Sequence, residues 1–229
     1  MNLPQGELRD FLIAKANQYA QSRFIQDDPI QVPHSFASTK DIEISGLIAA
    51  MLSWGGRKTI ISKSKDLMER MDNSPADFVT NASSVDLNSF DGFVHRTFKD
   101  EDIRGLVLAL QQLYQDYASI GEFFKQNLTP DATNLGGAFT VFKIFLLNHG
   151  LPQRASKHFG DPTKGSACKR LVMYSRWMAR PNTEGIDFGI WGIDPALLSV
   201  PLDVHSGRVA RSLGLLTRKQ NDWKADIEL

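Results

Sequence analysis

Apolar residues recur at three- and four-residue steps along most of the chain, which is the spacing of amphipathic α-helices. Capping signals set off several of these runs. Asp41 precedes an apolar run that Gly55-Gly56 ends, and Ser74-Pro75 has the residue order of a helix start. The predicted helices are a first one with Leu8, Phe11, Leu12, Ala16 and Tyr19 on one face, then 42–54, 57–71, a short helix from 75, 100–117, 134–148 and 164–179.

The remaining segments lack this helical period. No pair of apolar strands flanks a hairpin turn, and no internal repeat occurs. The segments 121–134 and 150–164 are expected to be irregular connections, and 181–201 is expected to carry only short turns. A last helix, opened by Asn221 or Asp222, is expected to be cut short. The pattern therefore predicts an all-α fold.

Composition narrows the class of protein. Apolar residues make up 42% of the 229 residues and charged residues 23%, as in a soluble globular protein of one domain or of two lobes that share a cleft. The formal net charge is zero, but the segment from Lys164 to Lys219 contains nine basic residues and only four acidic ones. A basic region on a neutral protein favours a polyanionic partner.

Several other classes of protein are disfavoured. Cys168 is the only cysteine, which excludes intrachain disulfides, a multi-cysteine zinc site and a four-cysteine iron–sulfur cluster. The acidic residues show no metal-ligand spacing, and no glycine loop of nucleotide-binding type is present, so we expect no metal and no cofactor. With no secretory signal and no apolar run long enough to span a membrane, we expect a cytoplasmic protein.

The segment 201–215 is the most informative. A helix that follows Asp203 carries His205, Arg208 and Arg211 at three-residue steps, near one face. A carboxylate at the start of a basic helix suits chemistry on a polyanion, because the arginines hold phosphates while the acid faces the reacting atom. The same aspartate is also what an ordinary helix N-cap looks like.

Three segments in order resemble the helix-hairpin-helix DNA glycosylase superfamily, which includes endonuclease III. Residues 44–54, followed by Arg57-Lys58, are similar to its early apolar helix and the loop that approaches the lesion. Residues 165–171 are similar to the end of its hairpin, with Ala167 in place of the usual second glycine. Residues 202–215 are similar to its Val-Asp-Thr-His helix, which begins with the catalytic aspartate.

The resemblance covers the chain from about Asp41 and is closest to a bacterial branch described only as a domain of unknown function. It implies a two-lobed helical fold of the glycosylase type without an iron–sulfur cluster, with 1–40 and 130–229 as one lobe and 41–129 as the other. It also implies a nucleoid-associated monomer that binds double-stranded DNA with a flipped base, and not a membrane. Lys169 and Asp203 lie 34 positions apart, as in the archaeal 8-oxoguanine glycosylase branch more than in endonuclease III.

The resemblance assigns two catalytic residues. Asp203 stabilises the positive charge that grows on the deoxyribose as the base leaves, and it orients or deprotonates the nucleophile. Lys169 attacks the sugar and forms a Schiff base when its amine is neutral, and Lys164 is the fallback for this role. If neither lysine reaches Asp203, water is the nucleophile. The alternative for Lys169 is a solvated lysine in the first turn of a helix.

The same resemblance supplies candidate DNA contacts. His205, Arg208 and Arg211 are expected to hold phosphates, together with the backbone N–H groups of Gly165, Ser166, Ala167 and Cys168. Trp54 and Arg57 lie where the lesion-side loop falls, and Trp54 is a candidate to stack on a base or to fill the gap of a flipped nucleotide. Trp177 and Trp191 are further candidates for a base pocket. The alternatives are solvated arginines, a histidine bonded to its own helix start, and core packing for each tryptophan.

Three functions stay open at this point. The leading hypothesis is a base-excision glycosylase, with or without a lyase step. The second is a module on the same fold that binds damaged or distorted DNA without cutting it. The third is a helical protein-interaction domain with no role on nucleic acid.

Overall fold

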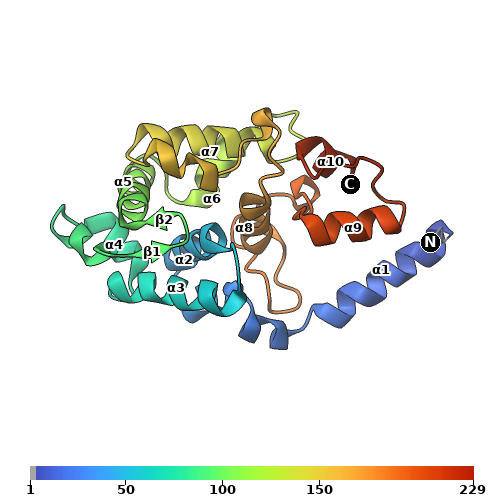
Figure 1. The fold of residues 1–229 in the computed structure, drawn as a ribbon, viewed down its shortest axis with the longest axis horizontal. Coiled ribbons are helices and arrows are strands. Elements are labelled where there is room, and N and C mark those ends of the chain that lie inside the picture. Colours follow the sequence, from blue (N-terminus) through green and yellow to red (C-terminus); the bar gives the residue numbers. More distant parts are fainter. Residues whose placement is uncertain (1–3) are drawn as a thin grey trace.

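The computed structural model describes residues 4–229, and Figure 1 shows that they form a largely helical protein. The helices are α1 (Gln5–Tyr19), α2 (Thr39–Leu52), α3 (Arg57–Arg70), α4 (Pro75–Asn81), α5 (Asp100–Asp116), α6 (Ile120–Gln126), α7 (Gly136–Asn148), α8 (Lys169–Ala179), α9 (Val204–Ser212) and α10 (Trp223–Glu228). Strands β1 (Val94–His95) and β2 (Phe98–Lys99) pair antiparallel. Short 3₁₀ turns span Ser22–Asp27, Pro29–Gln31, Pro33–Ser35, Asp86–Phe90, Gln153–His158, Pro162–Lys164 and Pro195–Leu197.

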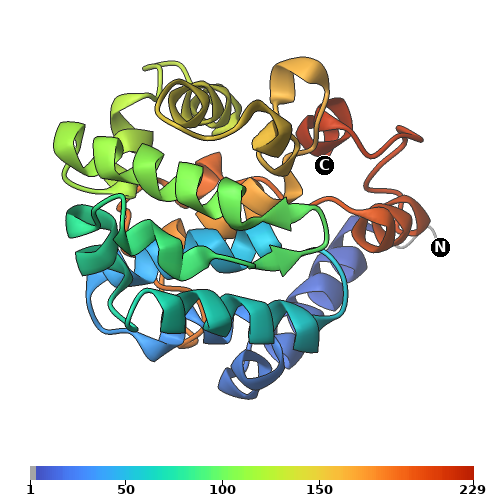
Figure 2. The same cartoon turned by 60° about the vertical axis from the view of Figure 1, so that its left-hand side comes forward.

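Helix α2 lies at the centre of the fold. Every residue from Ile42 to Leu52 is buried, as expected for a helix that is apolar on all sides. Ser38 caps its start, and α8 packs closely against it, since a Cβ on Gly46 would lie 2.5 Å from the Met178 side chain. In Figures 1 and 2, α8 lies between the group formed by α2 to α5 and the pair α9 and α10.

A buried carboxylate ties α2 to its neighbours. Glu43 is fully buried, and its oxygens accept hydrogen bonds from the Trp191 indole at 2.7 Å and from the backbone N–H groups of Gly121 at 2.8 Å and Ile120 at 3.2 Å. The Tyr114 hydroxyl donates to the same carboxylate at 3.3 Å. Burial raises the pKa of Glu43, although these hydrogen bonds oppose the shift. The side chain of Glu43 therefore joins α2, α5, the start of α6 and the segment before α9.

Most of the predicted helices are confirmed, and their ends show what the periodicity cannot reveal. The helix predicted at 164–179 begins only at Lys169, because Gly165 and Cys168 adopt left-handed backbone conformations with φ of 82° and 48°. Helix α1 forms where the first amphipathic helix is predicted, but none of its residues is buried. Its apolar stripe faces solvent, and α1 extends away from the central helices in Figure 1.

Two predictions about irregular segments are wrong. The segment 121–134 contains most of α6, whose start is capped by Ser119 and by Glu43 from another helix. The hairpin β1–β2 was not expected, because its strands are two residues long and its turn lacks an Asn-Gly type signal. The segments 150–164 and 181–201 contain only short turns, as predicted.

Most buried apolar side chains form one core cluster, whose members come from segments between Ile30 and Trp223. A smaller apolar cluster packs α9 and α10 together, and its buried members are Ala167, Leu202, Ala210, Leu216 and Ala225. Among residues 4–229 no helix is long and apolar enough to cross a membrane.

Replacement of Glu43 by Gln tests the buried carboxylate. The amide places an NH₂ group among N–H and O–H donors, so at least one buried donor loses its acceptor, and we expect a loss of about 3 kcal/mol in the free energy of unfolding. Urea denaturation followed by circular dichroism measures this loss. Glu69→Gln on the exposed face of α3 is the matched control. A change below ~1 kcal/mol for Glu43→Gln would show that the network contributes little.

Candidate active site

The structure brings together the two residues that the sequence singles out for catalysis. Lys169 is the first residue of α8, and Asp203 immediately precedes α9. The Lys169 Nζ donates a hydrogen bond to Asp203 Oδ2 at 2.6 Å, and both side chains are partly exposed. The left-handed Cys168 turns the chain into α8 so that the first side chain of the helix points toward α9.

The two oxygens of Asp203 have different partners. Oδ1 accepts the backbone N–H groups of His205 at 2.8 Å and Ser206 at 2.9 Å and so caps α9, while Oδ2 faces Lys169. Partial burial works against ionisation, but the hydrogen bond from Lys169 and those from the helix start prevail and lower the pKa of Asp203 to about 2. Asp203 is therefore both an N-cap and an ionised carboxylate next to a lysine.

A second set of contacts holds Asp203 in place from behind. The Asn221 side chain donates to the Asp203 carbonyl at 3.0 Å, and Arg211 donates to Asn221 Oδ1 at 2.8 Å. Gly207 is needed for this approach, because a Cβ there would lie 2.5 Å from Asn221 Oδ1. Arg211 also donates to the Arg218 carbonyl at 2.7 Å. Arg211 thus faces the body of the protein, and its guanidinium is engaged in contacts other than the expected phosphate.

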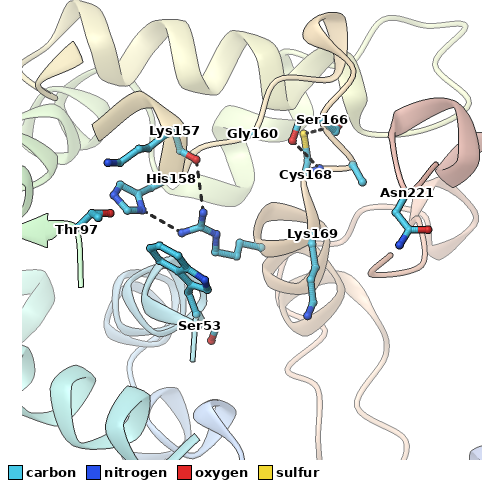
Figure 3. Close-up of a pocket in the computed structure, with 12 residues that line it drawn as sticks. Ser53, Thr97, Lys157, His158, Gly160, Ser166, Cys168, Lys169 and Asn221 are labelled. Atoms are coloured by element: carbon cyan, nitrogen blue, oxygen red, sulfur yellow. Dashed lines mark hydrogen bonds between the residues drawn. The ribbon is translucent and has the colours of Figure 1, made fainter. Parts of the chain in front are cut away.

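A cavity of about 520 Å³ opens beside this pair. Figure 3 shows Lys169 extending from the start of α8, with Thr97 and His158 on one side and Asn221 on the other. The described residues that line it include no acid, and they are Ser53, Trp54, Thr97, Lys157, His158, Gly160, Ser166, Ala167, Cys168, Lys169, Arg170 and Asn221. Its wall is therefore basic and suits a ligand that carries negative charge.

Arg170 fixes the wall of the cavity next to Lys169. Its guanidinium donates to the Met51 carbonyl at the end of α2 at 2.8 Å and to His158 Nδ1 at 3.1 Å. Burial, together with the charge of Arg170, lowers the pKa of His158 to about 4, so this ring is neutral near pH 7 and accepts through Nδ1. Arg170 is thus a structural cation that attaches the first turn of α8 to α2.

The loop before α8 is closely packed. The N–H groups of Gly165 and Ser166 donate to the carbonyls of Pro162 and Asp161, and that of Cys168 donates to Ser166 Oγ. Three of the four N–H groups expected to hold a phosphate are therefore already bonded within the protein. Burial raises the pKa of the Cys168 thiol to about 12, so this cysteine is a packing residue that stays protonated.

The other predicted contact residues lie in different settings. His205 and Arg208 are exposed on α9, and among residues 4–229 neither side chain has an ion pair or hydrogen-bond partner. Arg57 is exposed at the start of α3, with its guanidinium 6.0 Å from the Phe24 ring centroid, and does not line the cavity. Trp177 and Trp191 are buried in the core, which corrects their assignment to a base pocket.

Trp54 is exposed, which contradicts the alternative that core packing buries it. Helix α2 ends at Leu52, two residues before the predicted end, and the indole lies on the cavity wall with 48% of its surface exposed. The sequence pattern did not identify Thr97, His158 or Asn221. Each reaches the site through a long-range contact that leaves no periodic signal in the sequence.

Among residues 4–229 no cluster of three or more His, Cys, Asp or Glu side chains is arranged to hold a metal ion. The fold and the site together define a helical protein with a lysine–aspartate pair beside a basic cavity. Over residues 28–229 the chain matches the family described as "Protein of unknown function (DUF2400)", and it belongs to that family. Comparisons with curated proteins and with solved structures return no match.

Replacement of Lys169 by Met tests the electrostatics of the pair. Loss of the ammonium removes a charge and a hydrogen bond, so the pKa of Asp203 should rise from about 2 toward its usual range, while the bonds from His205 and Ser206 persist. Carbon-detected NMR of the carboxyl group measures the shift. Lys164→Met in the neighbouring turn is the control. An unchanged Asp203 pKa in the Lys169 variant would mean that the pair is open in solution.

The same pair predicts the acid limb of the stability profile. The pKa of Asp203 is lower in the folded protein than in the unfolded chain, so the ionised carboxylate stabilises the folded state. This contribution to the free energy of unfolding is complete above about pH 4 and is lost as the pH falls toward about 2. The Asp203→Asn variant cannot ionise at this position and lacks this pH-dependent contribution. Thermal unfolding should therefore show a smaller difference in stability between wild type and Asp203→Asn at pH ~2 than at pH ~6. A constant difference over this range would contradict the assignment.

Proposed function

We propose that this protein is a DNA base-excision glycosylase that hydrolyses the N-glycosidic bond of a damaged base. The observation that carries the proposal is the 2.6 Å contact between Lys169 Nζ and Asp203 Oδ2 beside a basic cavity. It supports the resemblance of 165–171 and 202–215 to the glycosylase motifs, since the two candidate residues meet although 34 positions separate them. Substrate and partner are a double-stranded DNA with a flipped nucleotide.

Asp203 is the electrostatic catalyst in this proposal. The bond between the anomeric carbon and the base breaks with both electrons going to the base, and positive charge builds on the sugar ring. With a pKa of about 2, Asp203 is ionised at working pH and stabilises that charge through Oδ2. The two N–H bonds to Oδ1 hold the carboxylate in one orientation, so little reorganisation is required during the reaction.

Lys169 acts as the nucleophile of the lyase step in this proposal. An amine attacks only when it is neutral, whereas Lys169 Nζ is held in an ion pair with Asp203. Attack therefore requires the pair to separate and a proton to leave Nζ. The amine lone pair then bonds to the anomeric carbon, and the base departs with the bonding electrons and takes up a proton. The bond from the anomeric carbon to the ring oxygen breaks next, as the nitrogen lone pair forms a double bond to that carbon. The ring oxygen takes up the proton that Nζ gives up, and the product is a Schiff base. If the pair stays closed, water attacks instead and Lys169 only orients Asp203.

The exposed basic side chains support a DNA interface around the cavity. His205 and Arg208 lie within the first two turns after Asp203, and Lys157 lies on the cavity wall. Such groups contact phosphates, fix the register of the duplex and make binding sensitive to salt. Arg211 has no part in this interface, because its guanidinium binds Asn221 and the Arg218 carbonyl.

Excision assays on a panel of duplexes, each with one lesion, test the proposal. Wild-type protein should release the damaged base from at least one duplex, and Asp203→Asn should slow release at least ~100-fold because the charge on the sugar is no longer stabilised. Asp194→Asn is the matched control, since Asp194 also caps a helical turn but does not contact Lys169. Borohydride should trap a covalent adduct with wild type and Lys164→Gln, but not with Lys169→Gln.

Each negative outcome selects another function. Salt-sensitive duplex binding without excision, weakened by Arg208→Ala and unaffected by Asp203→Asn, would identify a module that only binds damaged DNA. The absence of any salt-sensitive affinity for DNA would identify a helical protein-interaction domain. Excision that survives Asp203→Asn would overturn the role of Asp203.

A further inference from the structure

Trp54 differs from the other tryptophans of the chain. Trp177, Trp191 and Trp223 are 2%, 1% and 8% exposed, whereas Trp54 is 48% exposed and forms part of the cavity wall. A large aromatic ring left half in water forgoes much of its apolar burial, and such rings in clefts commonly serve as stacking surfaces for ligands. The position of this ring beside the Lys169 cavity therefore calls for a ligand with a flat face.

The Trp54 indole is held from one side by Arg96. The Arg96 guanidinium carbon lies 5.0 Å from the centroid of the indole, which is a cation–π contact. Arg96 occupies the turn of the β1–β2 hairpin with a left-handed φ of 55°, a conformation that costs a non-glycine residue energy. The strained turn places this exposed side chain over Trp54.

Two contacts anchor the hairpin on which Arg96 sits. The ring of His95 bonds to the Leu52 carbonyl at the end of α2 at 3.0 Å, and Arg154 donates to the Thr97 carbonyl at 3.1 Å. The residues on both sides of Arg96 are therefore fixed to the body of the protein. The turn is rigid, and Arg96 and Trp54 have a defined relative position before any ligand arrives.

Gly55 gives Arg96 the room that it occupies. Gly55 has a φ of +124°, and a Cβ built on it would lie 2.5 Å from Arg96 Nη2. The backbone conformation requires glycine at this position, and a Cβ there would displace the Arg96 guanidinium. Gly55 and the end of α2 thus hold the Arg96 guanidinium against one face of the indole. Few surface arginines are held in one position in this way.

We propose that Arg96 is a positioning residue that holds the Trp54 indole ready to stack on the nucleobase next to the flipped nucleotide. This inference rests on the proposed function, because it needs DNA at the cavity. Base–aromatic stacking tolerates any base, since every base has a π-face, so the pair contributes affinity for an unstacked site and not for a sequence. The positive charge of Arg96 also suits the phosphates that flank such a base.

Fluorescence tests the inference with two probes. The duplex carries a tetrahydrofuran abasic analogue, which cannot be excised, and a 2-aminopurine as its neighbour. Stacking of Trp54 on 2-aminopurine should quench the probe, and DNA should shield Trp54 from acrylamide, which reports mainly Trp54 because the other three tryptophans are at most 8% exposed. The variants are Trp54→Ala, Arg96→Ala, Arg96→Lys and Gly55→Ala, with Arg9→Ala on the exposed α1 as the charge-matched control.

The expected results separate position from charge. Trp54→Ala should bind the abasic duplex about 10-fold more weakly and abolish the quenching. Arg96→Ala should weaken binding about 3-fold more than Arg9→Ala does and should lose most of the quenching even at saturating protein. Arg96→Lys should be intermediate, because it keeps the charge but not the planar stack. Gly55→Ala should resemble Arg96→Ala although it keeps the arginine, and circular dichroism checks that each variant is folded.

Three outcomes would overturn the inference. If Arg96→Ala and Gly55→Ala, at saturating protein, both quench 2-aminopurine as strongly as wild type does, Arg96 does not position the indole. If wild type and Trp54→Ala both bind the duplex without changing the fluorescence of 2-aminopurine, the indole does not reach a base. Excision that depends on Asp203 would in that case leave the proposed function intact. Absence of binding to any duplex would overturn this inference together with the proposed function.

Discussion

The buried carboxylate of Glu43 is the interaction on which the rest of the structure depends. It accepts hydrogen bonds from the buried indole N–H of Trp191, from the first backbone N–H groups of α6, which are also buried, and from the hydroxyl of the partly buried Tyr114. A charged or protonated carboxyl inside an apolar core is stable only when such donors surround it. Because those donors come from segments far apart in the sequence, the single side chain specifies where α5, α6 and the segment before α9 lie around α2.

The other end of α2 connects this core to the candidate site. The last carbonyls of a helix lack partners within the helix, and in α2 two of them accept donors from distant side chains, Arg170 at Met51 and His95 at Leu52. One donor belongs to α8, whose first residue is Lys169, and the other belongs to the hairpin that carries Arg96. The capping of one helix end therefore sets the spacing between the lysine and the exposed indole, which both line the cavity.

The sequence pattern predicted elements better than it predicted contacts. Helices α3, α5 and α7 follow from the 3.6-residue period, and Asp203 was recognised as the start of α9 because capping is encoded locally. The start of α8 was placed too early, since the left-handed conformation of Cys168 depends on loop packing that no local signal records. Likewise, the inward turn of Arg211 depends on Asn221 and on the absence of a side chain at Gly207, which meet only in the folded chain.

The two oxygens of Asp203 bind different groups, and this decides which oxygen can contact a reacting sugar. Oδ1 is committed to the helix start, so Oδ2 is the oxygen left for the reaction, and the Lys169 Nζ already bonds to one of its two lone pairs. A sugar cation at Oδ2 would share that oxygen with the ammonium. The lysine is therefore an internal competitor of any cationic species formed at Asp203. A cation formed at Asp203 therefore competes with a tethered ammonium, whose effective concentration at Oδ2 is high.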